Sequence, residues 1–155
     1  MAGGVWRTTV FWITALIRPL AEAAADGEFS MTTGLEGRRV LIVEDEALVA
    51  MLLETMIEDM GCHPVGPVAS VAEALDIVAK DGALDVALLD VNVAGREVFP
   101  VADALKAKSV PFVFSTGYGE GGLADAWRGH PTVQKPFTEA AIRDALRRSL
   151  GVSLV

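Results

Sequence analysis

The chain has 155 residues, of which 52% are hydrophobic, and this length suits one domain that can bury a core of its own. Its formal net charge of −8 argues against a nucleic-acid surface, because such a surface needs clustered lysine and arginine. The single cysteine, Cys62, excludes an intrachain disulfide and a cysteine-based zinc site, and it fits a reducing cytosol.

Residues 1–37 differ in composition from the rest of the chain and are treated as an N-terminal extension. Its apolar stretch, Val10–Ile17, is shorter than the ~20 residues that span a bilayer. Three interpretations stay open: an extension without a folded role, ahead of an alternative start at Met31; a helix over residues 5–25 that binds a membrane or a partner; and an export signal. Membrane contact is expected only through residues 5–25.

The first ordered element is predicted at residues 39–43, where an apolar run is typical of a buried strand. The acidic run Glu44-Asp45-Glu46 follows it and leads into a helix that ends at Gly61. Helical spacing predicts that the apolar face of this helix contains Leu48, Leu52, Thr55 or Met56, and Met60.

Residues 63–69 predict a short strand, and its two prolines place it at a sheet edge. Ser70 and Glu73 form a capping box that begins the next helix. The apolar residues of that helix are Val71, Leu75 and Val78. The run Val86–Leu89 is then typical of a strand buried on both faces, and Asp90 lies where this strand ends.

The sequence Ala94-Gly95 predicts a loop, and a helix is predicted at residues 98–106, with its proline in the first turn. Residues 111–115 form a fourth apolar run, which ends at Thr116. A glycine-rich loop and a short helix near residues 123–128 follow.

The fifth strand is predicted at residues 132–134, and Lys135-Pro136-Phe137 closes it. Thr138 caps a final amphipathic helix. Its inner face is predicted to contain Ala141, Ile142, Ala145 and Leu146, and its outer face Arg143, Arg147 and Arg148. Five strand-then-helix units in succession predict an α/β fold, with a parallel sheet and helices on both of its faces.

Polar residues follow four of the predicted strands, namely Glu44 and Asp45, Asp90, Thr116, and Lys135. Because parallel strands end at the same edge of a sheet, these side chains should meet where open α/β sheets bind ligands. Each residue alone also has a structural explanation, such as an acidic first helical turn or a solvated lysine. Their combination at four strand ends favours a functional site.

Three neighbouring carboxylates repel one another, and a divalent cation relieves this repulsion. Mg²⁺ prefers oxygen ligands, usually one or two carboxylates with water and phosphate. The lysine and threonine suit the remaining oxygens of a phosphoryl group. The predicted chemistry is phosphoryl transfer to an aspartate, in which the metal neutralises charge and aligns the reactants.

With these residues in place, the sequence resembles the receiver domain of two-component response regulators over about residues 38–150. The stretches that carry the resemblance are Val40–Glu46, Leu88–Asn92, Phe114–Gly117 and Gln134–Phe137. The resemblance implies a flavodoxin-like (βα)5 doubly wound parallel sheet with strand order 2-1-3-4-5. Residues 1–37 would add an extra N-terminal segment to this domain, and residues 151–155 a C-terminal tail.

The resemblance also implies roles for the site residues. Asp90 would be the phosphoacceptor, and Thr116 and Lys135 would contact the phosphoryl group. Mg²⁺ would be bound by Glu44, Asp45, Asp90 and the backbone carbonyl of Asn92. The phosphodonor would be a phosphohistidine on a sensor histidine kinase or on a histidine phosphotransfer protein.

Residues 114–118 look like the "FATGUY" signature of a group of stand-alone receivers. Most receivers carry Tyr or Phe three residues before the site lysine, where this chain has Thr132. We therefore expect signalling to rest on ordering of the glycine-rich loop at residues 117–122. Tyr118 and Trp127 either report this change or pack the short helix.

The prediction is a cytoplasmic, single-domain response regulator without an output domain. It would signal to a downstream protein or act as a phosphate relay or sink, and its catalysis would be limited to its own aspartyl phosphorylation and dephosphorylation. One alternative is a phosphorylation-independent interaction module on the same fold. The other is a phosphatase of the haloacid-dehalogenase type, although that class normally carries an acidic residue at the position of Asn92.

Overall fold

The computed structural model describes residues 33–153, except for the side chains of residues 119 and 120. The helix predicted over residues 5–25, and with it the interpretations of the N-terminal extension, lies outside the described residues. No helix in the described part of the chain combines the length and the apolarity needed to cross a membrane. The predicted domain limits, residues 38–150, remain a prediction; Leu35, which precedes them, is fully buried.

Five parallel strands form one sheet, in the order β2-β1-β3-β6-β7, which is 2-1-3-4-5 when the parallel strands alone are counted. The predicted α/β fold and strand order are thus confirmed. The elements in chain order are β1 (Arg39–Val43), α2 (Ala47–Asp59), β2 (His63–Val68), α3 (Val71–Lys80), β3 (Val86–Asp90), β4 (Asn92–Val93), β5 (Arg96–Glu97), α4 (Phe99–Ala107), β6 (Phe112–Thr116), the 3-10 segments η1 (Gly119–Gly122) and η2 (Asp125–Trp127), β7 (Thr132–Gln134) and α5 (Glu139–Leu150).

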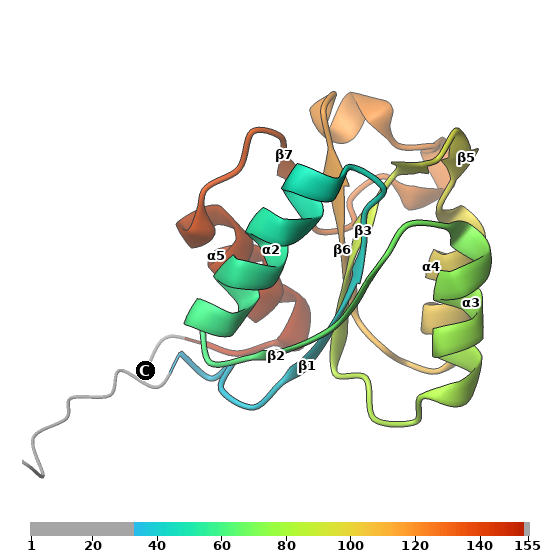
Figure 1. The fold of residues 1–155 in the computed structure, drawn as a ribbon. Helices are drawn as coiled ribbons and strands as arrows, with labels where there is room; N and C mark the ends of the chain where they lie inside the picture. The colour runs from blue at the N-terminus through green and yellow to red at the C-terminus, as the bar shows by residue number, and fades with distance from the viewer. Residues whose placement is uncertain (1–32, 154–155) are drawn as a thin grey trace, which may run out of the picture. The chain divides into compact units, whose positions relative to one another are not determined.

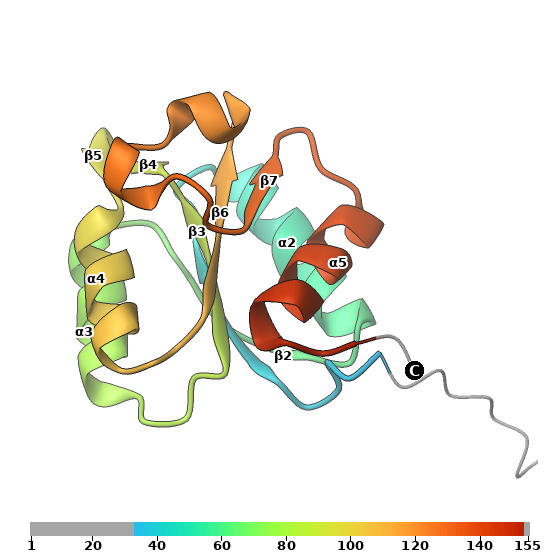
Figure 2. The ribbon, with the colours of Figure 1, turned by 180° about the vertical axis from the view of Figure 1, so that it is seen from behind.

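Helices cover both faces of the sheet: α2 and α5 pack on one face, and α3 and α4 on the other (Figures 1 and 2). Successive side chains of a strand point to opposite faces, so each central strand serves two cores. In β1, Val40 and Ile42 pack with the core under α2 and α5, while Leu41 and Val43 pack with the core under α3 and α4. Burial on both faces explains why these strands are continuous apolar runs in the sequence.

Helix α2 packs on the sheet through a different face from the one predicted. Its buried residues are Ala50, Leu53 and Ile57, whereas Leu48 is 82% exposed and Leu52 47% exposed. The helix carries two apolar stripes at helical spacing, and the stripe with the small Ala50 faces the sheet. Of the other predicted residues, Met60 is buried, Met56 is partly buried and Thr55 is exposed.

The predicted caps of α3 and α5 are present. The Ser70 hydroxyl accepts a hydrogen bond from the Glu73 backbone amide, and the Thr138 hydroxyl accepts one from the Ala141 amide. The Glu73 carboxylate accepts from the amide of Ala69 instead of that of Ser70, so the reciprocal half of the capping box is displaced by one residue.

The inner face of α5 differs in part from the prediction, and the segment after β3 holds a hairpin that was not predicted. On α5 the inner face holds Ile142, Ala145 and Leu146 as predicted, but Ala141 is exposed and Arg147 is buried. A long arginine can bury its aliphatic stem at the edge of a core, which helical spacing alone does not reveal. The predicted loop at Ala94-Gly95 is present as a two-residue turn, and it joins the short strands β4 and β5, which were not predicted, in an antiparallel hairpin.

Candidate functional site

The carboxyl ends of four parallel strands meet at one edge of the sheet. Val43 is paired with Leu89, Asp90 with Ser115, and Thr116 with Gln134, so each strand ends at about the same level as its neighbour. The residues that follow these strands therefore lie together. The hairpin β4–β5 and the segments η1 and η2 lie at this same end of the sheet (Figures 1 and 2).

Three carboxylates form an acidic cluster at this edge. Glu44, Asp45 and Asp90 each offer one carboxylate oxygen, and these oxygens all lie within 4.8 Å of one another. Glu44 and Asp90 are buried, whereas Asp45 is exposed. The arrangement places concentrated negative charge where two of the three groups have little solvent around them.

Lys135 neutralises part of this charge. Its Nζ lies 2.8 Å from Glu44 Oε2 and 3.0 Å from Asp90 Oδ2, and Glu46 Oε1 is 3.8 Å away. Burial by itself lowers the pKa of Lys135, but hydrogen bonds to Glu44 and Asp90 and the charges of both groups outweigh it, so the pKa is raised. The ammonium group is therefore held firmly in its charged form.

Burial is the main reason that the pKa of Glu44 is raised above its ordinary value, and the negative charge of Asp90 adds to the effect. The hydrogen bonds from Lys135 and from the Glu46 amide oppose this rise without cancelling it. Glu44 thus depends on its cationic partner Lys135 to stay charged.

Backbone amides also donate to the two aspartates. The Asn92 amide lies 3.3 Å from Asp90 Oδ1, and the Ala94 amide lies 3.0 Å from Asp45 Oδ2. Both donors belong to the β4–β5 hairpin. The Asn92 amide thus lies beside Asp90, while the predicted role of the Asn92 carbonyl as a Mg²⁺ ligand stays a prediction.

Thr116 is buried at the end of β6, and its hydroxyl accepts a hydrogen bond from the Tyr118 amide at 3.0 Å. Gly122, in η1, lies directly against this hydroxyl: a Cβ added at Gly122 would be 2.8 Å from Thr116 Oγ1. Real Cβ atoms essentially never come so close to another atom, so only glycine fits without movement.

An open cavity of about 510 Å³ connects these groups. Its lining contains predicted site residues together with residues that the sequence did not indicate, namely Asp45, Glu46, Asp90, Val91, Asn92, Glu97, Thr116, Gly117, Tyr118, Gly122 and Lys135. Five of the six predicted site residues line the cavity, and the sixth, Glu44, is buried and accepts a hydrogen bond from Lys135. Glu97 reaches the cavity because it pairs with Asn92 across the hairpin. The only sequence signal for this hairpin was the Ala94-Gly95 turn.

The oxygen donors fit a Mg²⁺ ion. Two ligand oxygens on opposite sides of this ion lie ~4.2 Å apart, since each is bound at about 2.1 Å. Carboxylate oxygens within 4.8 Å of one another reach that spacing by small side-chain rotations. Hard oxygen ligands of this kind suit Mg²⁺ and not a soft, thiolate-seeking metal.

The two candidate readout residues differ in their surroundings. Trp127 is buried and stacks at 6.1 Å on Phe99, with Phe112 and Phe114 edge-on at 5.7 Å. Its position agrees with the packing interpretation. Tyr118 is 86% exposed and lies at the rim of the cavity, so it is free to contact another molecule.

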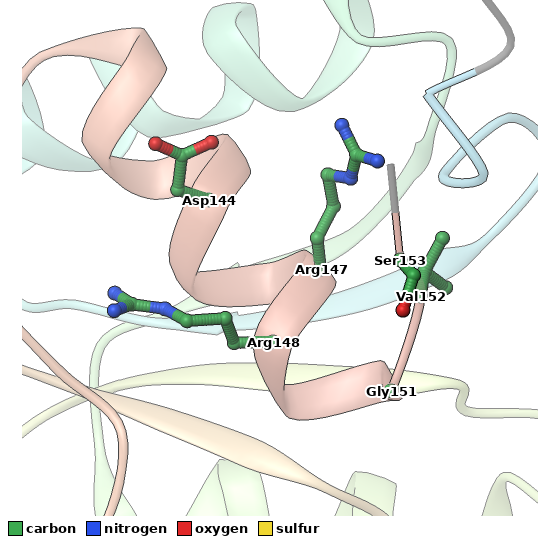
Figure 3. Close-up of a pocket in the computed structure, with 6 residues that line it drawn as sticks. All are labelled: Asp144, Arg147, Arg148, Gly151, Val152 and Ser153. Atoms are coloured by element: carbon green, nitrogen blue, oxygen red, sulfur yellow. The ribbon is translucent and has the colours of Figure 1, made fainter. Parts of the chain in front are cut away.

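A second cavity lies at the C-terminal end of α5, which is at the opposite end of the sheet, because Ser149 there bonds the carbonyl of Phe112 at the start of β6. Its described lining is Asp144, Arg147, Arg148, Gly151, Val152 and Ser153. Figure 3 shows the guanidinium groups of Arg147 and Arg148 pointing away from each other. The charged groups do not converge there, in contrast to the acidic cavity.

Comparison with known proteins defines the class to which this fold and site belong. Residues 40–147 match the model of the response regulator receiver domain. The chain therefore belongs to the response regulator receiver domain family.

Two individual proteins are similar to this chain in sequence over most of its length. The solution structure of SdrG from Sphingomonas melonis Fr1 is 44% identical, with a TM-score of 0.67, over 74% of this chain and 97% of SdrG. The phyllosphere-induced regulator PhyR of Methylorubrum extorquens is 32% identical over 72% of this chain and 43% of PhyR. The chain spans about half the length of the curated relatives it matches.

One further solved structure shares the fold alone. The receiver domain of sensor histidine kinase PA1611 from Pseudomonas aeruginosa PAO1 is 22% identical, with a TM-score of 0.63, over 74% of this chain and 98% of that domain. That structure has a magnesium ion coordinated in its active-site cleft.

Proposed function

We propose that the chain is a response regulator receiver that accepts a phosphoryl group on Asp90 in a Mg²⁺-dependent reaction. The observation that carries this proposal is the position of Lys135 Nζ, which lies between Glu44 and Asp90 in the wall of the acidic cavity. The three carboxylates can bind a divalent cation, and the ammonium group can bind a negatively charged phosphoryl group. Membership of the receiver family supports the same function.

In the proposed reaction, a carboxylate oxygen of Asp90 attacks the phosphorus atom of a phosphohistidine. The new oxygen–phosphorus bond forms as the phosphorus–nitrogen bond breaks, and the electron pair of the broken bond remains on the imidazole nitrogen. A bound Mg²⁺ held by Glu44, Asp45, Asp90 and the Asn92 carbonyl would neutralise charge on the transferred group. The Asn92 amide and Lys135 hold the Asp90 carboxylate in one orientation for the attack.

Lys135 and Thr116 would bind the phosphoryl oxygens. Lys135 can exchange its hydrogen bond to Asp90 Oδ2 for one to a phosphoryl oxygen while its bond to Glu44 persists. The Thr116 hydroxyl accepts from the Tyr118 amide, which leaves its own proton to donate toward the cavity. Lys135 thereby exchanges a contact within the protein for a contact with the transferred group, whereas Thr116 gains one.

A phosphodonor protein must reach Asp90 past the rim of the cavity, and the start of α2 provides an apolar surface there. Leu48, Met51 and Leu52 are 82%, 63% and 47% exposed and share one face of the helix at i, i+3 and i+4 spacing. Leu48, the first of them, lies three residues after Asp45 in the chain. We propose that this face binds the sensor kinase or phosphotransfer protein that carries the phosphohistidine.

Signal output is proposed to pass through the glycine-rich loop. Thr132 occupies the position before Lys135 where most receivers carry an aromatic ring, and its hydroxyl donates to the His130 carbonyl instead. Gly122 contacts the Thr116 hydroxyl, so a movement of Thr116 toward a phosphoryl group would alter the packing of η1. The exposed Tyr118 beside it is the residue through which a downstream protein would sense this change.

The remaining parts of the proposal follow from this role. The protein would act in the cytoplasm, bind a downstream protein or relay phosphate, bind no nucleic acid, and catalyse only its own aspartyl phosphorylation and dephosphorylation. The family match favours a receiver over a haloacid-dehalogenase-type phosphatase. A phosphorylation-independent binding module would leave the charged cavity residues without a role.

Beryllofluoride provides the test, since SdrG has been described in a BeF3-activated conformation. Beryllofluoride with Mg²⁺ should shift the amide resonances of Thr116, Lys135 and the loop at residues 117–122 in the wild type. The variant Asp90→Asn, which lacks the accepting carboxylate, should show none of these shifts. Equal responses in both proteins would contradict the proposal.

A further inference from the structure

The β4–β5 hairpin begins two residues after Asp90 and is built around a tight turn. Asn92 pairs with Glu97 and Val93 with Arg96, which leaves Ala94 and Gly95 as the two turn residues. Both have positive φ, +51° for Ala94 and +79° for Gly95. Positive φ at both central residues is the geometry that joins two short antiparallel strands with a right-handed twist.

The hairpin donates to two of the three carboxylates through alternate amides. The Asn92 amide donates to Asp90 Oδ1, and the Ala94 amide donates to Asp45 Oδ2. Asp45 lies 49 residues before Ala94 in the chain, so this contact ties the end of β1 to the segment after β3. Among the described residues, Ala94 is the only hydrogen-bond donor to the exposed Asp45 carboxylate.

We propose that the β4–β5 hairpin is a positioning element for the metal site, with the Ala94 amide holding Asp45 beside Asp90. The inference deepens the proposed function and rests on its assignment of Mg²⁺ to this cluster. An exposed aspartate samples several rotamers, and a fixed amide donor selects one of them, here a rotamer with a carboxylate oxygen within 4.8 Å of those of Glu44 and Asp90. Ala94 acts through Asp45 and is a positioning residue.

Gly95 allows the hairpin to be perturbed without new contacts. A Cβ added there meets nothing within 4 Å, so Gly95→Ala acts only through the strained positive φ of the turn. Gly129 offers a matched control, because its φ is +85° and an added Cβ also meets nothing within 4 Å. Gly129 lies after η2 and does not line the acidic cavity.

The experiment is a calorimetric titration of the full chain and its variants with magnesium chloride alone. Gly95→Ala should raise the Kd for Mg²⁺ about tenfold over Gly129→Ala, the usual effect of disturbing a partner of a metal ligand. Gly95→Asn should restore most of the affinity, since asparagine tolerates positive φ. Equal affinities for Gly95→Ala and Gly129→Ala would overturn the inference.

A second measurement does not depend on a variant of the turn. The Ala94 amide should exchange with solvent slowly in the wild type and faster in Asp45→Ala, which lacks its acceptor. Unchanged exchange would also overturn the inference. Failure of the wild type to bind Mg²⁺ is a distinct result, because it would refute the proposed function on which the inference rests.

Discussion

The contact between Gly122 and Thr116 gives the most discriminating substitution, Gly122→Ala. The added Cβ would lie 2.8 Å from Thr116 Oγ1 and 3.3 Å from Tyr118 Cβ, whereas ordinary van der Waals contact begins at 3.4 Å. The loop or the hydroxyl must therefore move by about 0.6 Å. Rotation of the Thr116 side chain would break its hydrogen bond with the Tyr118 amide, so either movement costs free energy.

The expected size of the effect follows from this displacement. Forcing an extra carbon into a packed contact costs about 1–3 kcal/mol, and we expect a value near the lower end because η1 lies at the surface. A displacement of 1 Å in a reacting group can cost about 100-fold in rate, so a shift of about 0.6 Å should cost about tenfold. Gly122→Ala should therefore lose about 1 kcal/mol of stability and about tenfold in phosphorylation rate.

The assay compares Gly122→Ala with Gly121→Ala, whose added Cβ would meet nothing within 4 Å. Urea unfolding measures the free energy of unfolding, and intact mass after mixing with a small phosphodonor and Mg²⁺ measures the rate. Gly121→Ala should match the wild type within about 0.5 kcal/mol, as surface substitutions usually do. Equal phosphorylation rates for the two variants would refute the assigned contact between the loop and the hydroxyl.

Three other predictions follow from the charges and surfaces of the site. Lys135→Met should lower the free energy of unfolding by about 2–3 kcal/mol at pH 7, because two buried carboxylates lose their counter-charge. The pKa of Lys135 in the folded state is raised above its ordinary value of 10.5. The stability that its charge contributes is therefore fully present below pH 10.5 and is lost as the pH rises through the pKa of the folded state. Urea titrations of Lys135→Met should lack this alkaline decline. Mg²⁺ at 100 times its Kd should stabilise the wild type by about 2.7 kcal/mol. Thermal scans of Asp90→Asn at the same Mg²⁺ concentration should show a smaller stabilisation. Leu48→Ala combined with Leu52→Ala should leave stability unchanged and slow phosphotransfer from a donor protein but not from a small phosphodonor; equal slowing of both would place the defect in the site itself.

The strands and the site could be predicted because buried parallel strands have a direct signature in sequence. The runs that precede Glu44, Asp90 and Ser115 are apolar on both faces, so their ends were visible as the first polar residues. Parallel strands then require those ends to meet. The gathering of Glu44, Asp45, Asp90 and Lys135 follows from that rule alone.

Other features could not be predicted because the sequence is ambiguous or silent about them. Helix α2 has two apolar stripes, and the choice between them depends on how closely Ala50 can approach the sheet. The strands of the β4–β5 hairpin have two residues each, too few to show a period. The hydrogen bond between Ala94 and Asp45 joins backbone to a distant side chain, and no pattern of residue types encodes it.

The most direct test of the central claim is the intact mass of the wild type and of Asp90→Asn after incubation with a small-molecule phosphodonor and Mg²⁺. The account predicts one added phosphoryl group in the wild type, lost again with time, and none in the variant or without Mg²⁺. Addition to both proteins, or to neither while Mg²⁺ is bound and the fold is intact, would contradict Asp90 as the phosphoryl acceptor.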